Sequence, residues 1–200
     1  MRAHLFKFFG FIFFVLSAFI VIPVSAQIKN SDDTTSLETL LNKARQLAYN
    51  NGRAEARKIC FEILNRDSTY WDAAVLLGRT YSWDSKYDSS RIALNKVIVK
   101  KPGYYDAMEA LIDNELLDDK YSSAIKYADD GLLYLPDNEI FLYKKARALN
   151  KSGKTKESKA LLSRILQINS SNKEAAKLLL DIKRDGRVNK FTMSYSTDIF

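Results

Sequence analysis

The sequence repeats itself with a period of 34 residues, four times in succession, without an insertion or a deletion. One row of equivalent residues closes the four blocks: Ser68, Pro102, Pro136 and Ser170. A second row marks a turn inside each block: Gly52, Lys86, Lys120 and Lys154. Self-similarity at a fixed period of this length is typical of stacked repeats, in which each unit buries its apolar face against its neighbours.

Each block contains two apolar patterns at helical spacing. In the second block, residues 71–82 carry Ala74, Leu77, Gly78 and Tyr81 at this spacing, and residues 87–99 continue it. Such spacing places one apolar stripe of each helix against a neighbour. Two helices in a 34-residue period resemble the tetratricopeptide repeat. We therefore expect an all-α fold, an α-solenoid of four helix pairs followed by a cap helix, over residues 37–186.

Small residues stand where the paired helices of this repeat cross closely. On the first helix of each block they are Ala44, Gly78 and Ala146, and Ile112 departs from the pattern in the third block. On the second helix, Ser90 and Ser158 replace the alanine of the other two blocks. The second block therefore matches the repeat best and the third matches it least.

Residues 173–185 predict the cap helix, because a terminal repeat cannot bury both of its faces. Ser171 and Glu174 form a capping-box pattern before it, as Thr35 and Glu38 do before the first block. Gly186 is expected to end the cap helix.

After Gly186 the apolar pattern changes to a period of two. Phe191, Met193, Tyr195 and Ile199 alternate with polar residues. This alternation is typical of a β-strand, so we expect residues 187–200 to form an amphipathic, strand-like tail. Because a lone strand is not stable, the tail docks on the array, pairs with another chain, begins a sheet or stays disordered.

The first 26 residues have the features of a signal peptide. A basic start with Arg2 and Lys7 precedes an apolar run from Phe8 to Val24, and Ala26 offers a cleavage point before a polar leader, residues 27–36. A retained signal anchor is the alternative, because the run approaches the length of a membrane span.

Composition restricts the chemistry of the exported chain. Without the two basic residues of the signal segment, 29 Lys and Arg stand against 24 Asp and Glu, a net charge of +5. The only histidine, His4, leaves with that segment, and Cys60 falls at a position expected to be buried between helices. With no phosphate loop, metal-ligand cluster or triad, we expect no enzyme, no cofactor and no metal site. Without a concentrated basic stripe, we expect no nucleic-acid partner.

Three segments resemble YaiO-type outer-membrane β-barrel proteins. Residues 78–83 (Gly-Arg-Thr-Tyr-Ser-Trp), followed by Tyr87, resemble the Gly-Arg-x-Tyr-x-Trp motif of that family. Residues 144–149 resemble its last-repeat helix, and residues 190–200 its first barrel strand. The resemblance implies a tetratricopeptide portion that faces the periplasm, or an outer-membrane location, in a Gram-negative bacterium. The barrel itself is missing, so a truncated product, a fragment and a relative without a barrel all stay open.

The concave face of such an array is lined by first-helix side chains, and there we expect a protein or peptide partner to bind. The candidate groove residues are Arg45, Asp72, Arg79, Trp83, Asp106, Glu109, Asp113, Tyr143 and Arg147. Two alternatives are open. Arg79 and Asp113, in adjacent blocks, can instead form an ion pair, and Trp83 can pack against a neighbouring repeat.

The acidic residues Glu109, Asp113 and Asp118 admit a second interpretation, as a pair of glycoside-hydrolysing carboxylates. Their spacing is that of an ordinary solvated helix face, which we favour. The sequence therefore indicates a non-catalytic interaction scaffold. The alternative is a freestanding periplasmic or signal-anchored adaptor that docks its tail on a partner's sheet.

Overall fold

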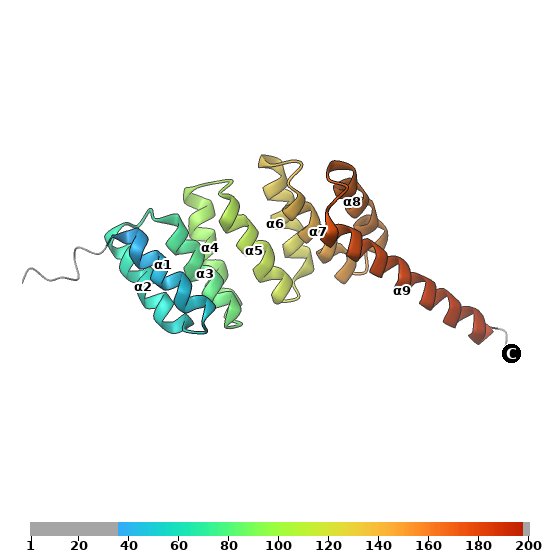
Figure 1. Cartoon of the computed structure of the whole chain (residues 1–200), viewed down its shortest axis with the longest axis horizontal. Coiled ribbons are helices and arrows are strands. Elements are labelled where there is room, and N and C mark those ends of the chain that lie inside the picture. The colour runs from blue at the N-terminus through green and yellow to red at the C-terminus, as the bar shows by residue number, and fades with distance from the viewer. Residues whose placement is uncertain (1–35, 198–200) are drawn as a thin grey trace, which may run out of the picture. The chain divides into compact units, whose positions relative to one another are not determined.

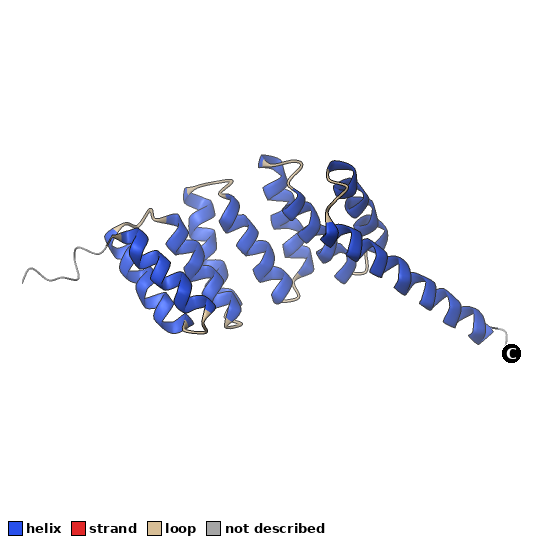
Figure 2. Cartoon of the chain, viewed as in Figure 1, coloured by secondary structure: helices blue, strands red, loops and turns tan. Residues whose placement is uncertain are grey.

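The structure, a computed structural model, describes the backbone of residues 36–197 and the side chains of residues 36–185. The predicted signal segment, nearly all of the leader and the last three residues lie outside this part. The described residues form nine helices in a row (Figure 1): α1 Leu37–Tyr49, α2 Arg53–Arg66, α3 Trp71–Trp83, α4 Tyr87–Lys100, α5 Tyr105–Leu117, α6 Tyr121–Tyr134, α7 Glu139–Lys151, α8 Thr155–Ile168 and α9 Lys173–Thr197. Between residues 36 and 197 there is no strand (Figure 2).

The helices follow the sequence period. In every repeat the first helix (α1, α3, α5 and α7) has 13 residues and the second helix (α2, α4, α6 and α8) has 14. The four predicted turn residues each directly precede a second helix: Gly52, Lys86, Lys120 and Lys154. The expected α-solenoid of four helix pairs is confirmed.

One turn conformation joins the two helices of every repeat. The residue before each second-helix cap has a positive φ: Asn51 (65°), Ser85 (56°), Asp119 (53°) and Gly153 (84°). The next backbone N–H then donates to a carbonyl near the end of the first helix, as from Gly52 to Leu47 at 2.7 Å and from Lys154 to Leu149 at 2.8 Å. This is the Schellman arrangement, which pairs the last carbonyls of a helix.

Where the residue at the close crossing of two paired helices changes in size, the residue that faces it on the other helix changes in the opposite sense. In the second repeat a Cβ atom on Gly78 would lie 2.5 Å from Cγ of Leu94, so the glycine makes room for the leucine. In the third repeat the sizes are reversed, because the fully buried Ile112 stands in the row of Gly78 and the fully buried Ala128 in the row of Leu94. The departure of Ile112 from the repeat pattern is therefore compensated on the facing helix.

A second exchange occurs between repeats, where α6 meets α7. At the other junctions a buried Ile or Val on the second helix faces a buried Ala on the next repeat, as Val97 and Ala107 do. Here Gly131 replaces the branched residue and Phe141 replaces the alanine. A Cβ atom on Gly131 would lie 2.7 Å from the Phe141 ring, which is itself fully buried. The ring therefore occupies space that a side chain fills elsewhere.

Cys60 is fully buried in the first repeat. Burial raises the pKa of its thiol to about 12, so the thiol stays neutral and unreactive at physiological pH. The prediction that Cys60 is a core residue is confirmed.

Two predicted helix starts are shifted by one residue. The side chain that caps α1 belongs to Ser36, whose Oγ accepts from the backbone N–H of Thr39 at 3.1 Å. Before α9, Oδ1 of Asn172 accepts from the N–H of Ala175 at 2.9 Å. The capping residue stands directly before the helix, and Asn138 does the same for α7 one period earlier.

The end of the cap helix also differs from the prediction. The sequence predicts a stop at Gly186 and a strand beyond it, but the backbone of α9 stays helical through Gly186 to Thr197. A helix pairs its own backbone groups, whereas a single strand needs a partner that the described residues do not provide. Residues 198–200 and the side chains beyond Asp185 lie outside the described part, so docking of the tail on a partner stays a prediction.

Candidate interaction surfaces

The helix order creates two faces with different side chains. Successive first helices pack against one another along the array, α1 with α3, α3 with α5 and α5 with α7. Each second helix packs against its own first helix and against the first helix of the next repeat. The first helices therefore form a continuous surface, which we call the inner face, and the second helices form the outer face (Figure 1).

The inner face has a polar hollow of about 310 Å³ between the first two repeats and the third. Its lining contains four of the predicted groove residues, Arg45, Asp72, Arg79 and Asp106, together with Tyr49, Val75 and Leu76. Asp106 is exposed and has no ion-pair partner among the described residues. The fold thus brings these four predicted residues together around one depression.

A chain of ion pairs crosses the middle of the inner face. Arg79 lies 3.2 Å from Glu109 and 3.8 Å from Asp113, so the ion pair that the sequence leaves open is present. Lys144 of the fourth repeat approaches both carboxylates from the other side, at 3.1 Å from Glu109. Lys144 was not among the predicted groove residues, and the equivalent residues of the other repeats, Asn42, Leu76 and Ala110, are uncharged.

Arg45 and Asp72 form the corresponding pair at the N-terminal end, 3.4 Å apart. The hydroxyl of Tyr104 also donates a hydrogen bond to Asp72. Burial, together with this hydrogen bond, raises the pKa of Tyr104 well above its ordinary value, so the phenol remains a proton donor. Tyr104 packs against the core of the second and third repeats, and it also orients this inner-face carboxylate.

Trp83 and the two groove residues of the fourth repeat have different surroundings. The ring of Trp83 lies 5.5 Å from that of Tyr49, tilted by 42°, and contacts the core of the first repeats, as the packing alternative requires. Tyr143 packs partly against the core of the last repeat. Arg147 is exposed and forms no ion pair with any described side chain.

Arginines of the second helices link neighbouring repeats at the turn end, and Arg53 and Arg57 of α2 both pair with Asp84. Arg57 donates to Asp84 at 2.7 Å and to the carbonyl of Thr80 at 3.1 Å, and the Arg57 bond lowers the pKa of Asp84. One period later, Arg91 binds Asp118 and reaches Glu115, which is fully buried, at 2.5 Å. At the third junction Ile125 stands in the row of Arg57 and Arg91 and cannot form such a link.

The carboxylates that could suggest hydrolysis are all held by cations. Burial alone would raise the pKa of Asp118, but hydrogen bonds from Lys120 and Arg91 outweigh it and keep that pKa below its usual value. Glu109 and Asp113 share Arg79 and Lys144. All three carboxylates thus form ion pairs with cations of neighbouring repeats, so the arrangement favours a structural role for these residues. Over the described residues, no group of His, Cys, Asp or Glu side chains could hold a metal ion.

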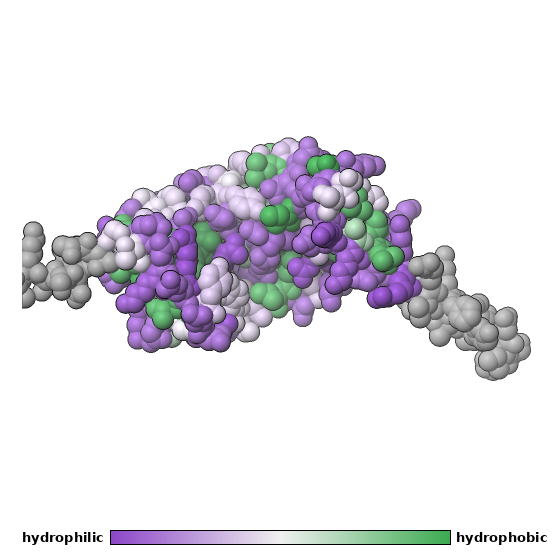
Figure 3. All heavy atoms as spheres, in the orientation of Figure 1, coloured by the Kyte–Doolittle hydropathy of each residue, from purple (hydrophilic) through white to green (hydrophobic). Residues whose placement is uncertain are grey.

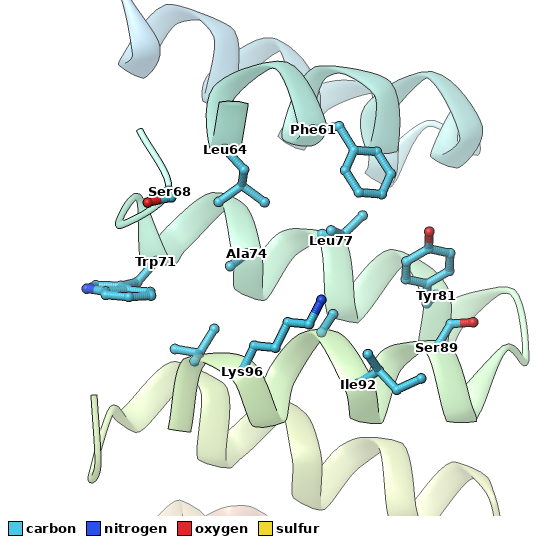
Figure 4. Close-up of a pocket in the computed structure, with 12 residues that line it drawn as sticks. Phe61, Leu64, Ser68, Trp71, Ala74, Leu77, Tyr81, Ser89, Ile92 and Lys96 are labelled. Atoms are coloured by element: carbon cyan, nitrogen blue, oxygen red, sulfur yellow. The ribbon is translucent and has the colours of Figure 1, made fainter. Parts of the chain in front are cut away.

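The outer face has an apolar groove that the sequence did not reveal. It has a volume of about 500 Å³ between α2, α3 and α4. Phe61 and Leu64 of α2 lie on one side, Ile92 of α4 lies on the opposite side, and α3 between them contributes Trp71 and Tyr81 (Figure 4). Trp71, the first residue of α3, lines one end of this groove. Elsewhere the visible surface is mainly hydrophilic, with apolar residues in small groups (Figure 3). Because three helices contribute side chains to the groove, the apolar pattern of any one helix in the sequence does not predict it.

None of the described helices is both long and apolar enough to cross a membrane.

No known family model matches the sequence, and no curated protein matches it. Solved structures with a similar fold do exist. A thermophilic TPR protein from Thermus thermophilus has a TM-score of 0.64 at 14% identity, over 81% of this chain and 89% of that chain. MamA from Desulfovibrio magneticus RS-1, residues 41 to the end, has a TM-score of 0.64 at 12% identity, over 81% of this chain and 92% of that chain.

A tetratricopeptide repeat protein from Parabacteroides merdae ATCC 43184 is also similar, with a TM-score of 0.64 at 14% identity over 76% of this chain and 60% of that chain. At such identities the likeness concerns the fold. The nine described helices therefore form a solenoid of tetratricopeptide-like repeats.

Proposed function

We propose that this chain is a non-catalytic scaffold that binds a protein or peptide on its inner face. The observation that carries the proposal is the polar hollow lined by Arg45, Asp72, Arg79 and Asp106. Two arginines and two aspartates around one depression offer charge-assisted hydrogen bonds to the backbone and side chains of an extended segment. The exposed Arg147 extends the same face toward the fourth repeat.

The location of this activity is a second part of the proposal. The predicted signal segment and the resemblance to YaiO-type proteins support a chain that faces the periplasm, as the soluble portion of an outer-membrane protein. A freestanding or signal-anchored periplasmic adaptor is the alternative. In either case, the candidate partners are proteins of the cell envelope that the repeats can reach from the periplasm.

The inner-face proposal is tested by reversing one charge in the hollow. Asp106→Lys changes an exposed carboxylate that has no ion-pair partner among the described residues, so the fold should be unaffected. Glu157→Lys on α8 is the matched control, because Glu157 is also exposed, has no ion-pair partner among the described side chains and lies outside the hollow. A photo-reactive residue in place of Tyr49, which is 71% exposed at the hollow, reports the partner in cells.

We expect one discrete cross-linked partner from position 49, lost in Asp106→Lys and kept in Glu157→Lys. The same photo-reactive residue in place of Leu133, which is 80% exposed on α6, should capture none. Equal capture from both positions, or equal effects of both charge reversals, would refute binding on the inner face.

Location is tested by fractionation of cell envelopes with antibody to the repeats. A heavy, heat-modifiable band in the outer membrane supports the YaiO-like proposal. A band near the 22.9 kDa of the full chain, or slightly below it, in the soluble periplasm supports the adaptor.

A further inference from the structure

The last helix continues the repeat period. α9 begins at Lys173, one period after Glu139 begins α7, and Asn172 caps it as Asn138 caps α7. Ala175 is fully buried against the fourth repeat, in the row of the buried Ala107. The first half of α9 therefore occupies the place of the first helix of a fifth repeat.

A fifth repeat would need a second helix, and none packs there among the described residues. In the fourth repeat the positions that face the second helix include Leu142 and Ala146, which are buried in the cluster that contains Leu162 of α8. One period later these positions are Ala176 and Leu180. Both are exposed, Leu180 by 59%. The face that receives a second helix in every complete repeat is open on α9.

The open face is strongly cationic. At 100° per residue, Lys173, Lys177, Lys183 and Arg184 lie within an arc of about 120° that is centred near Leu180. The acidic residues of α9 lie to one side of this arc, and two of them pair with Arg184, Asp181 at 3.2 Å and Asp185 at 3.9 Å. No described side chain forms an ion pair with any of the three lysines.

The charge of the fourth repeat adds to this field. Residues 139–185 carry 12 Lys and Arg against 5 Asp and Glu, whereas residues 36–138 carry 14 against 16. The positive charge of the described chain is therefore concentrated at its C-terminal end.

We propose that an acidic amphipathic helix from a partner protein docks on α9 and serves as the second helix of the fifth repeat. Aspartate or glutamate on its flanks would meet Lys173, Lys177 and Lys183, which attract such a helix over a distance of about 10 Å at moderate ionic strength. The residue opposite Leu180 should be small. Leu180 stands in the row of Ile112, and the residue in the facing row of that repeat is Ala128.

Two other occupants fit less well. A lipid surface requires a broad apolar face, and among the described residues Leu180 is the single large apolar side chain within the cationic arc. A second copy of the chain would place α9 against α1 and α2, whose exposed charges are mixed and include Lys43, Glu38 and Lys58. Neither surface complements the three lysines that have no ion-pair partner among the described side chains, whereas an acidic helix does.

The test uses a designed 16-residue helical peptide with glutamates on both flanks of an alanine-centred apolar stripe, labelled for fluorescence anisotropy with the whole chain. The α9 variant is Lys173→Glu/Lys177→Glu/Lys183→Glu. The matched control is Lys151→Glu/Lys154→Glu/Lys156→Glu at the turn between α7 and α8, three exposed lysines without ion-pair partners among the described side chains. The two variants have the same net charge.

We expect the α9 variant to bind the peptide at least tenfold more weakly than the unchanged chain, and the turn variant to stay within about threefold of it. Leucine in place of the central alanine of the peptide should also weaken binding, because Leu180 fills that space. Equal losses in the two variants would show unspecific charge attraction and overturn the proposal. Vesicles of anionic phospholipid that bind the turn variant but not the α9 variant, in the absence of peptide binding, would assign the face to lipid.

Discussion

At the scale of single residues, the repeats tolerate variation because changes in volume come in facing pairs. Phe141 fits only because Gly131 on the preceding helix has no side chain. Protein interiors are packed so densely that neither residue could change alone without a clash or a cavity. When each position is compared with the repeat pattern by itself, the two residues of such a pair look like two unrelated deviations from the pattern.

The Gly131–Phe141 pair gives the first prediction. Gly131→Val should cost about 1–3 kcal/mol by overpacking, and Phe141→Ala about 3–5 kcal/mol by leaving a cavity. The double variant recreates the combination of Val97 and Ala107, so it should be more stable than Phe141→Ala alone. Urea unfolding of the four proteins measures the coupling. Costs that simply add would show that the two residues do not share this space.

The buried pair of Arg91 and Glu115 gives the second prediction. Arg91→Ile alone should cost about 3–5 kcal/mol, because it leaves the fully buried Glu115 without its cation. The double variant Arg91→Ile/Glu115→Leu places there the residue types of Ile125 and Leu149 from other repeats. It should lie within about 1 kcal/mol of the unchanged protein. Thermal unfolding distinguishes the cases, and a double variant as unstable as Arg91→Ile would contradict the argument.

At the scale of elements, the inter-helix turn is the most regular part of the molecule. Four different residues, Asn51, Ser85, Asp119 and Gly153, adopt the same left-handed backbone conformation. Only one is glycine, so the turn is imposed by the two helices that it joins, with a backbone strain of about 1 kcal/mol where a Cβ atom is present. The turn residues predicted from the sequence, such as Gly52, each follow directly after the residue with the positive φ, such as Asn51.

The turn gives the third prediction. Gly153→Ala should destabilise the protein by about 1 kcal/mol through backbone strain alone, because no atom lies within 4 Å of the added Cβ. Ser85→Gly should stabilise it by a few tenths of a kcal/mol, since relief of strain is partly offset by a more flexible unfolded chain. Denaturation midpoints test both signs. A destabilised Ser85→Gly would mean that the serine side chain, and not the turn, sets the preference.

At the scale of the whole molecule, the array is quasi-one-dimensional, since each helix contacts only its near neighbours along the chain. Stability should therefore be local. The ion-pair links of Arg57 and Arg91 join the first three repeats, and Lys144 joins the third to the fourth. Over the described side chains, the ion pairs of α9 lie within α9, and the fourth repeat and α9 carry most of the uncompensated positive charge. The C-terminal end is the part of the described array that we expect to open first.

Two adjacent leucines of α9 give the fourth prediction. Leu179 is 9% exposed and Leu180 is 59% exposed. Leu179→Ala should cost about 2 kcal/mol or more, and Leu180→Ala should stay within about 0.5 kcal/mol. Hydrogen exchange of Leu179→Ala should show lost protection in α8 and α9 and unchanged protection in α1 to α3. Uniform loss along the chain would show one cooperative unit instead.

Much of the fold could be predicted from the sequence, because it rests on interactions repeated at a constant spacing. The period of 34 residues, the helix pairs and the buried Cys60 all follow from apolar residues that recur at helical intervals. The ion pair between Arg79 and Asp113 follows from the same period. Lys144 and Glu115 differ from the equivalent residues of the other repeats, and each forms an ion pair with a residue of another repeat. The repeat period alone does not predict these ion pairs.

The sequence by itself determined the repeat, its four copies and the helix in each copy that contributes to the inner face. The tertiary structure decided which of those residues meet around the polar hollow, that Trp83 packs on Tyr49, and that the apolar groove and the open face of α9 exist. It also decided that the backbone after Gly186 is helical. The physical reason is that these features depend on contacts which are not repeated along the chain. Periodicity reports contacts made in every repeat, whereas each of these features depends on side chains brought together once, by the packing of a particular pair of helices.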